Sequence, residues 1–238
     1  VSLALGHNGN LINTRELAGL LSDPPGGRGP GSTGIEATSD TDVLTALFVS
    51  DPAALGRADG AVPGGAADTD GPFGPQPPAS PVETTAAAVL PLAKGAYSLV
   101  FMDEQTLYAA RDPHGFRPLV LGRLDTGWVV ASETAALDIV GARFVREIAP
   151  GELVCIDGRG VRSRTFAAAQ PSGCLFEYVY LARPDTTISG RGVHATRVAA
   201  GRRLAAEHPA DADLVIPVPE SGTPAAIGFA EASGIPFG

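Results

Sequence analysis

Short apolar runs separated by polar or Gly/Pro-rich stretches cover most of the chain, and their spacing predicts its elements. The opening run, residues 1–5, predicts a strand that ends at the polar stretch Gly6-His7-Asn8-Gly9-Asn10. Asn-Gly after a strand is typical of a hairpin turn, but the apolar positions that follow, within residues 13–21, recur at helical spacing. We therefore expect a strand followed by a helix, with Asn13 and Glu16 at the positions of a capping box.

The pattern between residues 38 and 168 predicts antiparallel strands with helices packed outside them. Helical spacing occurs over residues 43–48, 84–92 and 134–140. Turn sequences such as Asp112-Pro113-His114-Gly115 separate the remaining apolar runs. Strands this close together along a chain pair antiparallel. The expected strands cover residues 96–102, 106–110, 118–122, 128–131, 152–156 and 161–166.

The pattern changes after about residue 168. A long helical run (193–207), a short apolar run (213–216), a Pro/Gly/Ser loop and a second helical run (224–232) follow one another. Helix, strand, loop and helix in this order are typical of a parallel α/β domain. We therefore expect an antiparallel α+β domain over residues 1–168 and the start of an α/β domain over residues 169–238. Residues 51–81, rich in Pro, Gly, Ala and Asp, predict a disordered surface insertion in the first domain.

Composition excludes several classes of protein. The chain has 238 residues, of which 44% are hydrophobic and 18% charged, as in a globular protein. Its apolar stretches are shorter than the roughly 18 residues that a membrane span needs. A net charge of -9 argues against nonspecific nucleic-acid binding, which needs a basic face. Small anionic substrates remain compatible with this charge, because a few arginines or helix N-termini can hold them locally.

The termini and the cysteines bear on where the protein works. The N-terminus has no basic segment or cleavage pattern typical of a secretion signal, which favours the cytoplasm. Cys155 and Cys174 are too few for a disulfide framework, although one bridge between them is not forbidden. The chain lacks an initiator Met, begins inside a strand and stops at Gly238, where another strand is expected. We therefore expect it to be an internal fragment with neighbouring segments at both ends.

Two stretches could carry chemistry, and each has a structural alternative. The side-chain amide of Asn8 and the backbone N–H of Gly9 could stabilise the oxyanion that forms during acyl transfer. Alternatively, they form a tight turn before the helix. Asp40 could bind a substrate ammonium group, whereas Ser39 and Asp42 have the Ser-x-x-Asp spacing of a capping box, which by itself is the more common use.

The motifs together are more specific than each alone. The chain contains, in this order, residues 7–11 (HNGNL), 39–41 (SDT), 94–97 (KGAY), 112–119 (DPHGFRPL) and 131–134 (ASET). This series resembles class II glutamine amidotransferase domains, which use an N-terminal nucleophile. Residues 174–180 (CLFEYVY), 182–185 (ARPD), 217–222 (PVPESG) and 225–230 (AAIGFA) resemble the amidophosphoribosyltransferase family in particular. Apart from residues 51–81, the resemblance covers nearly the whole chain.

The resemblance implies a fold and a set of site residues. The fold would be part of an αββα N-terminal-nucleophile glutaminase domain, followed by the start of a type I phosphoribosyltransferase domain. Asn8 and Gly9 match the oxyanion hole, and Asp40 matches the carboxylate that holds the α-amino group of glutamine. Cys174 matches the first of four cysteine ligands of a 4Fe-4S cluster, with a buried structural thiol as the alternative, and Ser221 matches a magnesium ligand. Asp112, Arg117 and Glu133 also match family positions, and we interpret them as structural: a turn, an anchor and a helix start.

The implied activity joins two reactions. Glutamine would be hydrolysed in the first domain, and the ammonia would replace pyrophosphate on phosphoribosyl pyrophosphate to give phosphoribosylamine, the first step of purine synthesis. The family's nucleophilic cysteine would lie before Val1, so residues 1–238 alone are expected to be inactive. We expect the full-length protein to form homo-oligomers, and we expect no nucleic-acid or membrane partner. The alternatives are another class II amidotransferase, such as the hexosamine-forming synthase, and a noncatalytic remnant of the fold.

Overall fold

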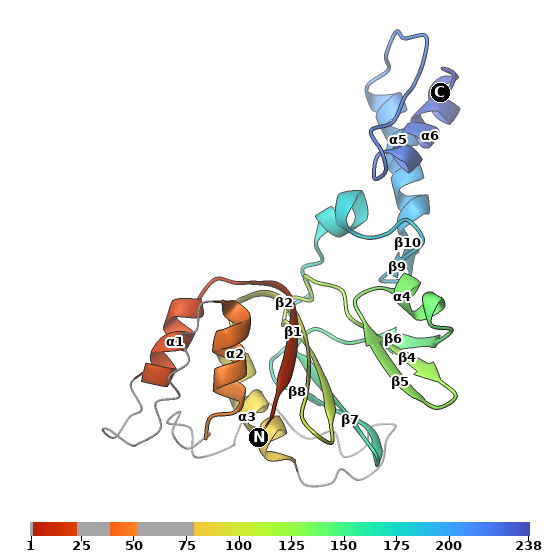
Figure 1. Cartoon of the computed structure of the whole chain (residues 1–238). Helices are drawn as coiled ribbons and strands as arrows, with labels where there is room; N and C mark the ends of the chain where they lie inside the picture. Colours follow the sequence, from red (N-terminus) through yellow and green to blue (C-terminus); the bar gives the residue numbers. More distant parts are fainter. Residues whose placement is uncertain (1, 23–38, 52–78) are drawn as a thin grey trace. The chain divides into compact units, whose positions relative to one another are not determined.

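The structure is a computed structural model that describes residues 2–22, 39–51 and 79–238 (Figure 1). Most of the predicted insertion at residues 51–81 lies outside the described residues. The chain forms two compact units, and each contains two separate segments. Unit 1 consists of Val1–Arg117 and Ile148–Gly173, and unit 2 of Pro118–Glu147 and Cys174–Gly238. The division into domains at residue 168 stays a prediction; the chain crosses between the two units three times.

Unit 1 is built on an antiparallel sheet whose strands lie in the order β1-β2-β3-β7-β8. Its first strand does not end at Asn8 and Gly9, so that prediction was wrong: β1 continues through both residues to Leu11 and pairs with β2 along its whole length. The expectation that no hairpin forms here was correct, because β2 begins only at Gly95. The strands are β1 (Ala4–Leu11), β2 (Gly95–Met102), β3 (Leu107–Arg111), β7 (Glu152–Asp157) and β8 (Gly160–Thr165).

Helices cover one face of this sheet (Figure 1). They are α1 (Thr14–Ser22), α2 (Asp40–Phe48), α3 (Pro81–Val89) and the short 3-10 helix η2 (Leu90–Leu92). Alternate residues of β1 face them, so Leu5 and Leu11 contact the same core as Leu44 and Leu47 of α2. Burial of this apolar face holds the layers together, at roughly 25 cal/mol per Å² of apolar surface removed from water.

The predicted helix starts are largely confirmed. Ser39 caps α2, and Ser39 and Asp42 form the expected reciprocal capping box. The Asn13 amide has a different role: its oxygen accepts a hydrogen bond from the backbone N–H of Lys94 at 2.9 Å, and its nitrogen donates to the Leu92 carbonyl and to Glu16. Asn13 therefore joins the start of α1 to the chain segment that enters β2.

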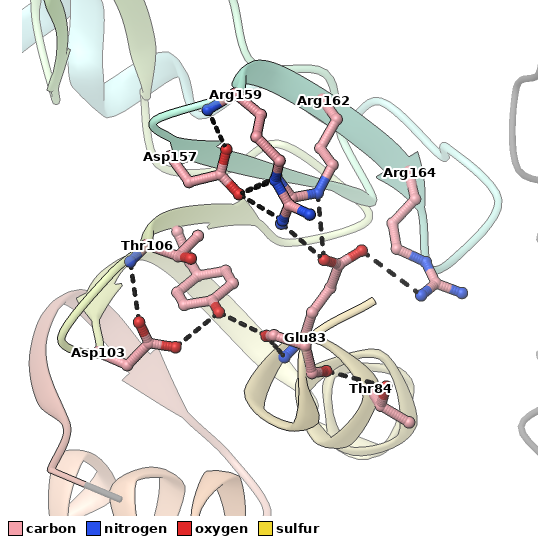
Figure 2. Close-up of polar contacts among 10 residues, drawn as sticks. Glu83, Thr84, Asp103, Thr106, Asp157, Arg159, Arg162 and Arg164 are labelled. Atoms are coloured by element: carbon pink, nitrogen blue, oxygen red, sulfur yellow. Dashed lines mark hydrogen bonds and ion pairs between the residues drawn. The ribbon is translucent and has the colours of Figure 1, made fainter. Parts of the chain in front are cut away.

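The hairpin of β7 and β8 carries a buried ion cluster at one end of the sheet (Figure 2). Arg162 lies between two carboxylates, with Nη1 2.7 Å from Asp157 Oδ2 and Nη2 3.1 Å from Glu83 Oε2. All three side chains are at most 7% exposed. Arg159 also binds Asp157, and Arg164 lies 3.9 Å from Glu83. The cluster links α3, which carries Glu83, to the last two strands of the sheet.

Unit 2 combines a small sheet with a helical part. Its strands β4 (Val120–Leu124), β5 (Gly127–Ala131) and β6 (Arg143–Glu147) pair in the order β5-β4-β6, next to α4 (Thr134–Ile139). The pattern did not predict β6, whose outward residues Phe144 and Val145 are exposed apolar side chains. The segment from residue 174 onward contains the π-helix η3 (Glu177–Leu181), β9 (Thr187–Ile188), β10 (Arg191–Gly192), α5 (Val193–Glu207) and α6 (Thr223–Ser233).

Helices α5 and α6 confirm the two helical runs predicted near the end of the chain, and they pack unusually closely. A Cβ atom on Gly201 would lie 1.9 Å from the Ala225 carbonyl oxygen, and one on Gly228 would lie 2.0 Å from that of Val198. The predicted strand at residues 213–216 is only a single parallel bridge between Val215 and Phe237 in the structure. No helix among the described residues has both the length and the hydropathy required to cross a membrane.

Candidate functional site

The amide of Asn8 is held by an arginine from a distant loop. Arg117 donates two hydrogen bonds to the Asn8 side-chain oxygen, from Nε at 3.1 Å and from Nη2 at 2.8 Å. Because both donors are N–H groups, the atom that faces them must be the amide oxygen. The Asn8 NH₂ group is therefore turned away from Arg117 and is the part of the amide that can serve as a donor elsewhere.

The backbone N–H of Gly9 points to the outer edge of the sheet. Gly9 lies opposite Tyr97 in the β1–β2 ladder. The N–H and C=O of Tyr97 both bind Asp112, on the far side of β2. Gly9 and Tyr97 are therefore a non-hydrogen-bonded pair, and both backbone groups of Gly9 point away from β2. Since β1 is the edge strand of the described sheet, its outer side is where a ligand could meet this N–H.

Only glycine fits at position 9. Its φ of 149° lies in the region that side chains disfavour, and a Cβ atom would lie 2.0 Å from the Ala96 carbonyl oxygen. The close approach of β1 to β2 thus depends on this residue.

Asp40 lies on the same edge of β1 as the Gly9 N–H. Its Oδ2 accepts a hydrogen bond from the backbone N–H of Leu11 at 2.8 Å, and its Oδ1 accepts one from the Thr14 hydroxyl. Leu11 and Gly9 are two residues apart, about 7 Å along a strand, and their N–H groups share one direction. A carboxylate can accept about four hydrogen bonds, so these two contacts leave room for a ligand ammonium group.

His7 lies on the helix-facing side of β1, near Asp40. Burial lowers the pKa of His7 below its usual value, although the negative charge of Asp40 acts in the opposite direction. Among the described residues its Nε2 has no hydrogen-bond partner. The imidazole of His7 and the carboxylate of Asp40 thus lie near each other at this end of β1.

Asp112 and Glu133 have structural contacts. Asp112 is fully buried and accepts hydrogen bonds from the N–H groups of Tyr97, His114 and Phe116, so it shapes the turn as interpreted from the sequence. Glu133 precedes α4 as expected, but its side chain does not cap that helix. Its Oε2 instead accepts from the N–H of Arg183 at 2.9 Å and the hydroxyl of Thr186 at 2.6 Å.

The two candidate metal ligands lie in unit 2, in different elements. Cys174 is a partly exposed free thiol three residues before η3, and Ser221 lies in the loop before α6. Cys155, in β7, is buried among apolar side chains of unit 1. No group of three His, Cys, Asp or Glu side chains within the described residues could hold a metal ion. The described residues alone therefore do not form a complete cluster or magnesium site.

The structure reveals contacts that sequence reasoning missed. The sequence identified Arg117 only as a structural anchor, and the structure shows that its side chain binds Asn8, 109 residues earlier. Ser98 and Arg111, which both bind the Arg117 carbonyl oxygen, had not been singled out. Their positions opposite Asn8 across two ladders depend on strand register, which the motifs do not contain.

Comparison with known proteins gives one consistent result. A family model described as a glutamine amidotransferase domain matches residues 80–139. Amidophosphoribosyltransferase of Mycobacterium tuberculosis (strain ATCC 25618 / H37Rv) is 56% identical over 236 residues, which cover 99% of this chain and 40% of that protein. The Bacillus subtilis (strain 168) protein of the same name is 38% identical and also matches 99% of this chain, but 43% of its own length. The chain thus spans about two fifths of the length of these relatives.

Solved structures agree with the sequence matches. The glutamine phosphoribosylpyrophosphate amidotransferase from B. subtilis, solved with ADP and GMP, superimposes with a TM-score of 0.78 at 37% identity. The match covers 99% of this chain and 45% of that structure. The sheet and helices of unit 1 thus have the glutaminase fold expected from the sequence. The chain belongs to the amidophosphoribosyltransferase family.

Proposed function

We propose that this chain supplies the oxyanion hole and the amino-group site of a glutaminase. The observation that carries the proposal is the arrangement along β1. The Asn8 NH₂ group is aimed by Arg117, the Gly9 N–H points from the sheet edge, and the Asp40 carboxylate lies two residues further along that edge. The two donors would bind the oxyanion formed from the side-chain carbonyl of glutamine. The Asp40 carboxylate, which contacts β1 at Leu11, would bind the α-ammonium group of the same molecule.

The chemistry requires a nucleophile, and the family resemblance provides one in a cysteine before Val1. Its thiolate would attack the side-chain carbonyl carbon of glutamine, forming a C–S bond while the carbonyl oxygen becomes an oxyanion. Asn8 and Gly9 would donate hydrogen bonds to this oxygen. Cleavage of the C–N bond, with a proton passing to the leaving nitrogen, would release ammonia, and water would then hydrolyse the thioester to glutamate.

We further propose that the complete protein uses this ammonia to convert phosphoribosyl pyrophosphate into phosphoribosylamine. Membership of the family supports this, as does the segment from residue 174 onward. There α5, the bridge at Val215 and α6 follow in the order expected for the start of a phosphoribosyltransferase domain. The domain limits 1–168 and 169–238 are part of the same proposal.

Cofactors, partners and location belong to the proposal for the complete protein. Cys174 would supply one of the four thiolates of a 4Fe-4S cluster, and the Ser221 hydroxyl one ligand of magnesium. No step of glutamine hydrolysis depends on either group. The free thiols of Cys155 and Cys174 fit a reducing, cytoplasmic location, and the net charge of -9 fits small-molecule substrates rather than nucleic acid. Homo-oligomers are expected from the resemblance.

Substitution of Asn8 in the protein expressed from its complete reading frame tests the proposal. Asn8→Ala removes one oxyanion donor and should lower the kcat of glutamine hydrolysis by about 10²–10³. Ammonia-dependent formation of phosphoribosylamine should remain nearly unchanged, because that reaction needs no glutaminase. Asn8→Asp is the matched isostere: it keeps an oxygen acceptor for Arg117, lacks the NH₂ donor, and should lose glutaminase activity without loss of thermal stability.

Equal loss of the two activities in Asn8→Ala would contradict the proposal, since it would indicate general damage to the fold. If the protein is instead a noncatalytic remnant of the fold, neither the unsubstituted protein nor any Asn8 variant should release glutamate from glutamine.

A further inference from the structure

We infer that Arg117 is a positioning residue for glutamine hydrolysis, which acts by fixing and polarising the amide of Asn8. The inference rests on the proposed function of Asn8 and assigns to Arg117 more than the structural role expected from the sequence. Arg117 need not touch the substrate for this role, because its effect passes through one side chain.

A single row of residues across three strands holds Arg117 in place. Asn8 of β1 lies opposite Ser98 of β2, and Ser98 lies opposite Arg111 of β3. Directly opposed residues of antiparallel strands project to the same face of the sheet. Arg117 contacts all three: its guanidinium binds Asn8, while its carbonyl oxygen accepts hydrogen bonds from Ser98 Oγ at 3.1 Å and from Arg111 Nε at 2.8 Å.

Arg111 makes the loop around Arg117 rigid. It is 6% exposed, and its other nitrogens donate to the carbonyls of Gly115 at 3.0 Å and Ile148 at 2.9 Å. One buried guanidinium therefore binds three backbone carbonyls, two of them in the loop that ends at Arg117. The Arg117 backbone is fixed by the sheet, and its side chain reaches back to the same sheet.

The charge of the guanidinium adds to this orientation. A cation that donates to the amide oxygen polarises the amide and makes its N–H groups better donors, since linked hydrogen bonds strengthen one another. It also prevents the amide from turning over, because an NH₂ group in that position would face two N–H donors. Arg117 thereby selects the one amide orientation that offers a donor to an oxyanion, before substrate binds.

Kinetics of Arg117 variants in the protein from the complete reading frame test the inference. Arg117→Ala should lower the kcat of glutamine hydrolysis by about 10- to 100-fold, less than removal of the donor itself. The KM for glutamine should change less than about threefold, and ammonia-dependent synthesis less than about twofold. Arg117→Lys keeps the positive charge but cannot make both hydrogen bonds to the Asn8 oxygen. Its kcat should therefore lie between those of the unsubstituted protein and Arg117→Ala.

A double-mutant cycle separates positioning from general stability. If Arg117 acts through Asn8, then Arg117→Ala should lower kcat by less than about threefold in an Asn8→Ala background. Arg159→Ala is the matched control, because it removes an arginine from the far end of the same sheet and should leave both activities unchanged. Thermal unfolding of each variant shows whether it is folded, and Arg117→Lys carries the test if Arg117→Ala is not.

Several outcomes would overturn the inference. Independent, multiplicative effects of the two substitutions would show that Arg117 does not act through Asn8. A large rise in KM would indicate direct contact with glutamine, and equal loss of ammonia-dependent activity would indicate a structural role only. If Arg117→Ala has normal glutaminase activity while Asn8→Ala is impaired, only the inference about Arg117 is wrong. If Asn8→Ala is fully active, both the proposed function and the inference are wrong.

Discussion

Two arginines at opposite ends of the sheet in unit 1 use the same chemical group for different purposes. Arg162, near the Leu107 end of β3, is buried between Glu83 and Asp157 (Figure 2). Arg117, near the Arg111 end, is half-buried and directs Nε and Nη2 at the uncharged amide oxygen of Asn8. At the first end a cation is neutralised by carboxylates of its own fold. At the second end a cation binds the oxygen of a neutral amide.

The difference shows how to distinguish a structural from a functional arginine. A buried ion cluster such as that of Arg162 satisfies its own charges, and removal of one member leaves another uncompensated. An arginine bound to an amide oxygen instead fixes which way the amide is turned, and so determines where its NH₂ group can donate. Arg162 is the more deeply buried of the two arginines and forms more ion pairs, which indicates a role in stability. Arg117 binds the amide of Asn8, a proposed oxyanion donor, and is therefore the arginine that we expect to affect the reaction.

Removal of Arg162 should have the largest effect on stability. Arg162→Ala leaves Glu83 and Asp157 buried with weakened compensation, and we expect the free energy of unfolding to fall by about 3–5 kcal/mol. Urea unfolding measures this change. The exposed neighbour provides the control, since Arg159→Ala should cost less than about 1 kcal/mol. If Arg162→Ala remained folded but lowered the kcat of glutamine hydrolysis, the assignment of a purely structural role to Arg162 would be wrong.

Neutralisation of Asp40 should have an intermediate effect, on binding rather than on stability. Asp40→Asn keeps an oxygen that can accept from the Leu11 N–H but loses the negative charge. A hydrogen bond to a charged group contributes about 1.5–3 kcal/mol, so the KM for glutamine should rise by roughly 10- to 150-fold while kcat changes less. An unchanged KM together with a lower melting temperature would show that Asp40 only fastens α2 to β1.

The smallest effect concerns the acid stability of the ion cluster. Hydrogen bonds from Arg159, together with those from Arg162, hold the pKa of Asp157 well below its usual value despite burial. The depressed pKa means that the charge of Asp157 contributes fully to stability above the pKa of the unfolded chain, about 3.9. This contribution is lost progressively as the pH falls from there through the lower pKa of the folded state. The difference in melting temperature between the unsubstituted protein and Asp157→Asn should therefore begin to shrink only as the pH falls below about 4, and it should be lost only near the depressed pKa of the folded state. A constant difference over this range would mean that the charge of Asp157 contributes nothing.

Much of the architecture follows from local sequence. The apolar spacing predicted α1, α2, α5 and α6, and Ser39 and Asp42 predicted the start of α2, because amphipathic helices and their caps depend on residues only a few positions apart. The strands around Asp112 and Gly127 were likewise predicted from turn sequences. β6 was missed, since its apolar residues face outward and give no core-facing alternation.

The sequence by itself singled out Asn8, Gly9 and Asp40 as candidate site residues, through the motifs that contain them. The tertiary structure decided which atoms each of them contacts. β1 continues through Asn8 and Gly9 because its backbone hydrogen bonds are completed by β2, more than 80 residues later, and no local pattern contains that partner. The same ladder sets Asn8, Ser98 and Arg111 in one row and brings Arg117 to the amide of Asn8. Motifs identify residue types and their order, but register and long-range pairing decide which atom each side chain meets.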